Sequence, residues 1–110
     1  IETFYEGRLA VMMLIREDFL ETESREGDTE DIVEKILIVK GVTAGVMLSD
    51  PPDSDTIRMS FRAKGDISIR SLALEFGGGG HEQAAGARSS GKPIDDVKSE
   101  LVQKAQKLFL

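Results

Sequence analysis

Four consecutive glycines end on the only histidine of this chain, in the order Gly77, Gly78, Gly79, Gly80 and His81. Glycine loses more backbone freedom on folding than any other residue, so four in a row disfavour order unless the backbone needs positive φ angles or a close approach that a Cβ would block. Successive N–H groups of such a loop also form concavities that hold anions. The run therefore predicts either a structural turn or a loop that contacts a phosphate group, and we favour the second.

The residues on both sides of the run are expected to be helical. Apolar residues at helical spacing predict a short amphipathic helix over residues 68–76, which leads directly into the glycines. Residues 82–85 (Glu-Gln-Ala-Ala) predict the start of another short helix, whose amino end would add partial positive charge near a bound anion.

Composition limits the remaining possibilities. A chain of 110 residues suffices for one domain with one core, and its formal net charge of −6 argues against a nonspecific nucleic-acid binder. A small pocket in which a few arginines bind one phosphate is still allowed. The absence of cysteine excludes disulfides and thiolate metal sites, and a cytoplasmic location is expected. The longest apolar run, residues 9–15, is too short to cross a membrane.

Three segments have the patterns of strands. Residues 8–16 contain a continuous apolar run, as in a strand covered on both faces. Residues 42–48 and 57–63 alternate between two faces and are separated by the turn signal Pro51-Pro52-Asp53, which predicts an antiparallel hairpin. Residues 87–92 are polar and predict an edge strand or a turn, and an uncovered edge strand would permit pairing into an oligomer.

Two longer helices complete the expected fold. One begins at Asp28 or Thr29 and ends near Gly41, and the other begins at Pro93 and continues to Phe109. The fold class is therefore α/β, a single domain with a small mixed sheet of about four to five strands and packed helices.

The alternating segment 57–63 places Arg58, Ser60 and Arg62 on its polar face. A guanidinium group binds phosphate through two parallel hydrogen bonds, so a hydroxyl flanked by arginines suits a phosphate site. The alternative is a solvated strand face, which we prefer for Arg58. Solubility also explains Arg88 and Lys92 adequately.

His81 has three chemical interpretations besides a purely structural one. As a metal ligand it lacks partners, because the chain has no second histidine and no cysteine. As a general base it lacks a visible nucleophile and orienting group. Hydrogen bonding to a phosphate is our preferred interpretation. We predict no metal site and no catalytic residue in this chain.

The string Phe76-Gly-Gly-Gly-Gly-His-Glu-Gln-Ala-Ala-Gly86 resembles the GGGH-x-x-AAG signature of the DHH-associated domain found in DHH-family phosphoesterases. Ser60-Phe61-Arg62 is similar to the S-x-R element of that family. Within the family, the chain looks most like the branch of bifunctional oligoribonucleases and 3'-phosphoadenosine-5'-phosphate phosphatases.

This resemblance implies that residues 1–110 are a carboxy-terminal substrate-binding domain. An amino-terminal domain of the same protein, absent from a chain that begins at Ile1, would bind manganese or magnesium and catalyse hydrolysis. The substrates would be phosphate esters of short single-stranded oligoribonucleotides or adenosine 3',5'-bisphosphate. The resemblance implies that the phosphate contacts come from the following residues: Ser60, Arg62, Gly77, Gly78, Gly79, Gly80 and His81.

Alone, the chain is expected to bind no cofactor and to be inactive, because it has no Asp-His-His motif. Three alternatives stay open at this point. The domain could be a noncatalytic nucleotide- or RNA-binding module, or belong to an exopolyphosphatase or a cyclic-dinucleotide phosphodiesterase. In the third alternative the glycine run serves packing alone.

Overall fold

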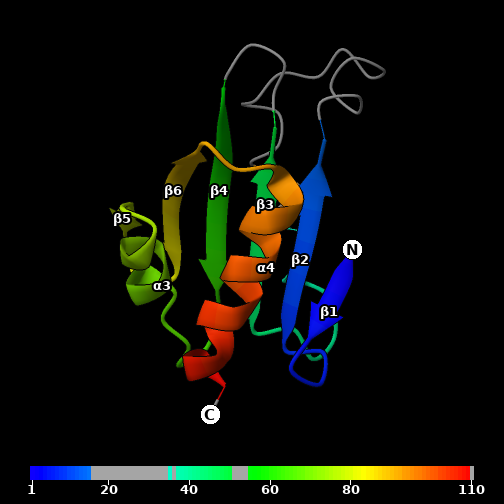
Figure 1. The fold of residues 1–110 in the computed structure, drawn as a ribbon. Helices are drawn as coiled ribbons and strands as arrows, with labels where there is room; N and C mark the ends of the chain where they lie inside the picture. Colours follow the sequence, from blue (N-terminus) through cyan, green and yellow to red (C-terminus); the bar gives the residue numbers. More distant parts are fainter. Residues whose placement is uncertain (16–34, 36, 51–54, 110) are drawn as a thin grey trace.

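A computed structural model describes residues 1–15, 35, 37–50 and 55–109. Within these residues, one sheet has the strand order β1-β2-β3-β4-β6-β5 (Figure 1). Its strands are β1 (Glu2–Phe4), β2 (Leu9–Leu14), β3 (Ala44–Ser49), β4 (Thr56–Ala63), β5 (Gly79–Gly80) and β6 (Ala84–Ser90). The helices are α3 (Arg70–Glu75) and α4 (Ile94–Lys104), and a 3-10 helix follows at Ala105–Leu108. The predicted small mixed α/β domain is confirmed.

The pairing of β3 with β4 agrees with the sequence prediction. β3 and β4 form an antiparallel hairpin, in which Ala44 lies opposite Ala63 and Ser49 lies opposite Arg58. β2 and β3 are parallel, which requires a crossover connection between them. The helix predicted from Asp28 or Thr29 to near Gly41 belongs to that connection and lies largely outside the described residues, as does the predicted turn at residues 51–53.

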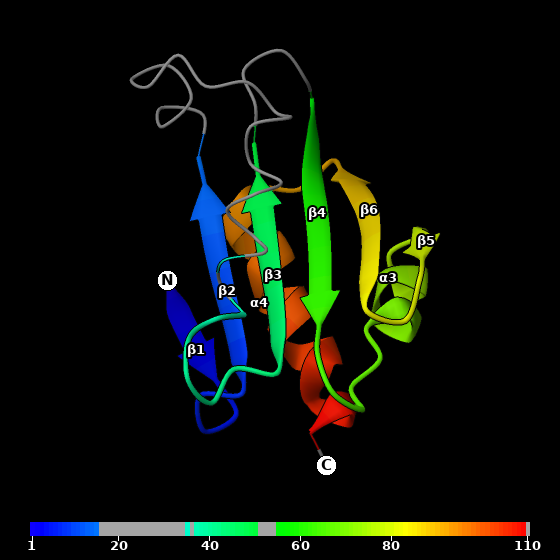
Figure 2. The same cartoon turned by 180° about the vertical axis from the view of Figure 1, so that it is seen from behind.

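The two faces of the sheet differ in what covers them. α3 and α4 lie on the same side, as Figures 1 and 2 show from opposite directions. The main core forms on that side and includes Val46, Phe61, Leu72 and Leu101, each at most 1% exposed. On β4, strand alternation turns Arg58, Ser60 and Arg62 to the opposite side. The burial of one face thus leaves the polar side chains of β4 together on the other.

Contacts between the two ends of the chain hold β1 and β2 against the end of α4. The Tyr5 hydroxyl donates a hydrogen bond to the Val102 carbonyl oxygen, and the Tyr5 ring stacks on Phe109 with 5.1 Å between centroids. The Arg8 guanidinium lies 5.1 Å from the centroid of the same Phe109 ring, within cation–π range. β1 was not predicted, because its three residues are mostly exposed and have no apolar alternation.

One helix prediction is wrong. The helix expected to begin at Glu82 is absent, and Ala84–Ser90 instead forms β6, which pairs with β4 from Arg62 opposite Ala84 to Thr56 opposite Ser90. Ala85 and Ala87 are each 8% exposed and pack into the main core, so tertiary packing overrides the helix propensity of alanine. The edge-strand prediction for residues 87–92 holds through Ser90, because β5 pairs with β6 only at Ala85 and Gly86.

A carboxylate on α4 supplies a prediction about pH. Glu100 accepts hydrogen bonds from Lys92, at 2.7 Å, and pairs with Lys104, at 3.3 Å, and these two ammonium groups hold the pKa of Glu100 below its usual value. A carboxyl whose pKa is lower in the folded state stabilises the protein above its unfolded-state pKa, and this contribution is lost as the pH falls through the folded-state pKa.

We therefore expect Glu100→Gln to lower the melting temperature near neutral pH and to have no effect once the carboxyl is protonated in acid. Thermal unfolding followed by circular dichroism at a series of pH values measures this difference. Glu82→Gln, on an exposed side chain, is the matched control. A Glu100→Gln deficit that is equal at all pH values would contradict the assignment of the stabilisation to the charged pair.

Candidate functional site

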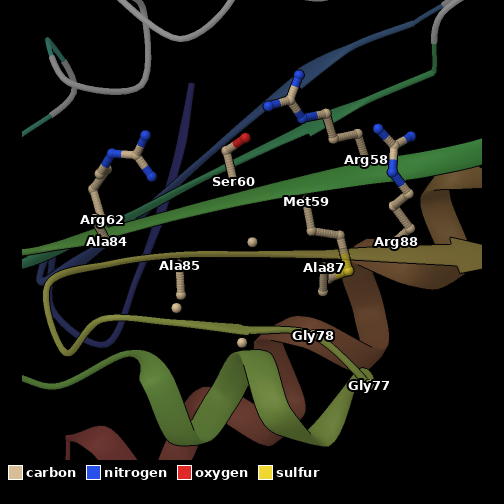
Figure 3. Close-up of a pocket in the computed structure, with 13 residues that line it drawn as sticks. Arg58, Met59, Ser60, Arg62, Gly77, Gly78, Ala84, Ala85, Ala87 and Arg88 are labelled. Atoms are coloured by element: carbon tan, nitrogen blue, oxygen red, sulfur yellow. The ribbon is translucent and has the colours of Figure 1, made fainter.

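A cavity of about 660 Å³ lies where the polar side chains of β4 meet the glycine run (Figure 3). Its volume is within the range of about 300–1,000 Å³ that is usual for small-ligand sites. The lining comes from β4, from the glycine run and from β6, and comprises residues 58–60, 62, 77–80 and 84–88. Of the residues predicted to contact phosphate, Ser60, Arg62 and all four glycines therefore line one cavity.

The strand register places Ser60 and two glycines in one row across the sheet. Ser60 lies opposite Gly86 in the β4–β6 pair, and Gly86 lies opposite Gly79 in the β6–β5 pair. Directly opposed residues of antiparallel strands project to the same face, so this row carries one small hydroxyl and then two positions without side chains. The row gives a ligand direct access to the backbone.

The Ser60 side chain is almost fully buried and has hydrogen-bonding capacity to spare. Its residue is 5% exposed, and its hydroxyl makes no hydrogen bond to another residue in the described part of the chain. Buried hydroxyl groups in folded proteins normally have a hydrogen-bond partner. Figure 3 shows the hydroxyl on the same side of β4 as the Arg58 and Arg62 side chains, so a ligand in the cavity can supply the partner.

Two of the four consecutive glycines are required by the way in which α3 ends. Gly77 has a φ of +78° and its N–H bonds to the Leu74 carbonyl, while the N–H of Gly78 bonds to the Ala73 carbonyl. These two hydrogen bonds are those of a Schellman motif, which ends helices with a glycine in the left-handed region. A Cβ on Gly78 would also lie 2.1 Å from the Gly86 carbonyl oxygen. Both positions therefore need glycine for folding.

Gly80 also needs glycine, whereas Gly79 does not. Gly80 has a φ of +143°, and a Cβ there would lie 2.7 Å from the Ala84 carbonyl oxygen. A Cβ on Gly79 would have no heavy atom within 4 Å and no positive φ to strain it. A Cβ on Gly86 would meet the Met59 carbonyl oxygen at 3.4 Å, an ordinary contact. The two glycines that folding does not require are the two in the row with Ser60.

Arginines flank the Ser60 end of that row, one on each side of Ser60 along β4. Arg62 lies on one side of Ser60, and its Nη1 donates a hydrogen bond to the Phe61 carbonyl oxygen at 2.8 Å. Arg58 lies on the other side of Ser60 and is opposed across the β4–β6 pair by Arg88. The described lining residues contain three arginines and no carboxylate. The described lining therefore brings three cationic side chains together on a chain whose net charge is −6.

Sequence reasoning assigned Arg58 and Arg88 to solvent, and the structure places both in the lining of the cavity, with Arg88 exposed. The signal that joins them to the site is their cross-strand register, which appears only once β6 is paired with β4. Lys92 lies elsewhere, since its ammonium group pairs with Glu100.

His81 is adjacent to the cavity but does not line it. Its side chain is exposed, and its N–H donates to the Ala84 carbonyl oxygen at 2.8 Å, which closes the turn between β5 and β6. Contact between the imidazole and a phosphate stays a prediction.

The described residues do not fit a metal centre. No three side chains of histidine, cysteine, aspartate or glutamate come together among them, and the lining of the cavity is cationic. The same part of the chain contains no helix long and apolar enough to cross a membrane.

The fold and the cavity define a small α/β domain with a cationic, glycine-lined pocket. Residues 7–109 match the DHHA1 domain, so the chain belongs to this family. DHHA1 domains occur together with DHH phosphoesterase domains, and the match confirms the resemblance described above. Over 100 residues it is 32% identical to the bifunctional oligoribonuclease and PAP phosphatase NrnA of Thermus thermophilus, which covers 91% of this chain and 29% of that protein.

Two solved structures share the fold. An exopolyphosphatase-related protein from Bacteroides fragilis is 26% identical with a TM-score of 0.83, over 98% of this chain and 32% of that one. The pGpG-specific phosphodiesterase PggH from Vibrio cholerae is 15% identical with a TM-score of 0.69, over 97% of this chain and 35% of that one. The chain thus spans about a third of the length of each of these proteins.

The two classes of glycine in the run predict different effects of adding one methyl group. Gly78→Ala should lower the free energy of unfolding by about 1–3 kcal/mol, because the Cβ clashes with β6 backbone. Gly79→Ala should leave it unchanged or raise it by about 0.4–1 kcal/mol, because alanine restricts the unfolded chain and fits the folded one. Urea unfolding of both variants measures the difference. Equal destabilisation by both changes would show that the whole run serves packing.

Proposed function

We propose that this domain binds the phosphate groups of a short oligoribonucleotide or of adenosine 3',5'-bisphosphate in the glycine-lined cavity. In the full-length protein it presents them to an amino-terminal DHH domain that hydrolyses the phosphate ester. The relatives named above support this substrate class, because one of them is an oligoribonuclease and PAP phosphatase.

The observation that carries the proposal is the row formed by Ser60, Gly86 and Gly79. A buried hydroxyl with no hydrogen-bond partner among the described residues lies beside two glycines that folding does not require. An anion can approach this surface closely and accept hydrogen bonds there, which a Cβ at either glycine would prevent.

The charges around the row suit a phosphate rather than an uncharged ligand. Hydrogen bonds between a guanidinium and a phosphate are short and roughly twice as strong as those between neutral groups. Arg62 is half-buried, so its interaction with a bound phosphate is screened by water less than that of an exposed arginine.

The contribution of these residues to catalysis is binding and orientation. Donors fixed in the fold before the substrate arrives stabilise the negative charge of the phosphoryl group without reorganising. A manganese or magnesium ion in the amino-terminal domain would supply Lewis-acid chemistry. Ser60, Arg62 and the glycine row hold the phosphate in place for it.

Isothermal titration calorimetry of the 110-residue chain tests the proposal directly. The ligands are adenosine 3',5'-bisphosphate, a 5'-phosphorylated RNA dinucleotide, pGpG and inorganic polyphosphate, and their affinities rank the competing substrate classes. Arg62→Gln should weaken binding of the preferred ligand about tenfold or more, because it removes a charged hydrogen-bond donor from the phosphate.

The matched control is Arg70→Gln, which makes the same charge change on an exposed residue of α3 outside the cavity. It should leave the affinity unchanged within about twofold. Equal losses of affinity in the Arg62→Gln and Arg70→Gln variants would show that only the net charge of the chain matters. An absence of binding by the folded wild-type chain at about 1 mM ligand would overturn the proposed binding site.

A further inference from the structure

The turn between β5 and β6, residues 81–83, separates two residues that line the cavity. Gly80 precedes the turn and Ala84 follows it, and both belong to the lining. The turn carries His81, whose side chain is exposed and whose contact with a phosphate stays a prediction. The position from which the imidazole can approach a ligand therefore depends on what fixes this turn.

Backbone hydrogen bonds attach the turn to the connection between β4 and α3, residues 63–69. The Ala63 N–H donates to the Gln83 carbonyl oxygen at 3.0 Å, and the Ile69 N–H donates to the Glu82 carbonyl oxygen at 2.8 Å. Figure 2 shows the turn beside this connection. Both bonds join main-chain groups, so they persist when the side chains of the turn are changed.

The side chain of Gln83 adds a further hydrogen bond between the turn and the connection. Its Nε2 donates to the Gly65 carbonyl oxygen at 2.9 Å. Gly65 has a φ of +68°, so this acceptor lies in a tight bend of the connection. In the part of the chain that the structure describes, the side chains of His81 and Glu82 make no hydrogen bond. Gln83 is thus the side chain that ties the turn down.

The same contacts link the turn to the end of the strand that carries Arg62. Ala63, which binds the Gln83 backbone, directly follows Arg62. Gly65, which binds the Gln83 side chain, lies two residues further along the chain. Fixing the turn therefore also fixes the backbone of His81 relative to that of Arg62.

We propose, on the basis of the proposed function, that Gln83 is a positioning residue, which holds the turn so that His81 and Arg62 meet the same phosphate group. Gln83 does not line the cavity, so it acts through His81 and not on the ligand itself. Donors that are fixed before a ligand arrives need no reorganisation when it binds. Without the hydrogen bond to Gly65, the turn keeps its backbone contacts but samples more conformations, and the imidazole meets the phosphate less often.

The first test uses His81 as the reporter. The chain has one histidine, so its imidazole Cε1–H group gives a single NMR resonance of this kind. Adenosine 3',5'-bisphosphate should shift this resonance in the wild type. Gln83→Met keeps the length of the side chain and removes the donor, so the shift at saturating ligand should be smaller in this variant.

A double-mutant cycle separates positioning from a general effect on the fold. Isothermal titration calorimetry measures the affinity for adenosine 3',5'-bisphosphate of the wild type, Gln83→Met, His81→Ala and the double variant. We expect Gln83→Met to weaken binding about threefold in the wild-type background and less than about 1.5-fold in the His81→Ala background. A side chain that only stabilises the fold would give equal losses in both backgrounds.

Two further variants serve as a control and as a rescue. Gln103→Met makes the same change on an exposed residue of α4 outside the cavity, and it should alter neither the His81 resonance nor the affinity. Gln83→Lys keeps an N–H donor at the end of the side chain, so it should restore the ligand-induced shift of the His81 resonance. Melting temperatures confirm that each variant is folded.

The outcomes distinguish this inference from the proposed function. The positioning role is overturned, while the phosphate pocket stands, by equal losses in both backgrounds or by equal His81 shifts in the wild type and Gln83→Met. A Gln83→Lys variant that responds like Gln83→Met, or ligand binding that leaves the His81 resonance unmoved, would overturn it as well. Failure of the folded wild-type chain to bind at about 1 mM ligand would overturn the pocket and this inference together.

Discussion

The antiparallel pairing of β6 with β4 is the constraint on which the site depends. It places Gly86 opposite Ser60 and Arg88 opposite Arg58, and through β5 it adds Gly79 to the same row. A slip of one residue in this register would turn Arg88 and Gly86 toward the core and Ala85 and Ala87 toward the face that carries Ser60. Because Ala85 and Ala87 pack into the main core, burial of apolar surface holds the polar residues in register.

The small side chains of β6 also explain how the glycine run approaches the backbone of β6 so closely. Gly78 has space for no Cβ because the Gly86 carbonyl and Ala87 lie against it. The end of α3 and the edge of the sheet are therefore joined by backbone contact rather than by side-chain packing. Three glycines of the run are required for this contact, because each has a positive φ or lacks space for a Cβ. At the fourth, Gly79, the position of a Cβ is unoccupied. Folding thus requires three glycines of the run, and the fourth remains available for the proposed contact with a ligand.

Much of this arrangement could be predicted from the sequence, and the reason for each failure is physical. The strands at β2, β3 and β4 and the helices α3 and α4 have periodic patterns that a local reading detects. β6 was read partly as a helix because its alanines favour helices, and only contacts with a distant strand decide otherwise. The grouping of Ser60, Arg62 and the glycines came from a family resemblance. The placement of Arg58 opposite Arg88 in the cavity lining could not be predicted, because cross-strand register is not visible in a single segment.

The contrast between the cavity and the whole chain bears on the length of the ligand. The chain has 20 acidic and 14 basic residues, and three of the arginines line one cavity. Affinity for long nucleic acids comes largely from many phosphate contacts spread along a basic surface. On this acidic chain, the described cavity offers such contacts over its own span, which is about 13 Å along the β4 backbone from Arg58 to Arg62. A longer polyanion gains no further attraction from the described cavity beyond this span, so the proposed phosphate ligand is a short one.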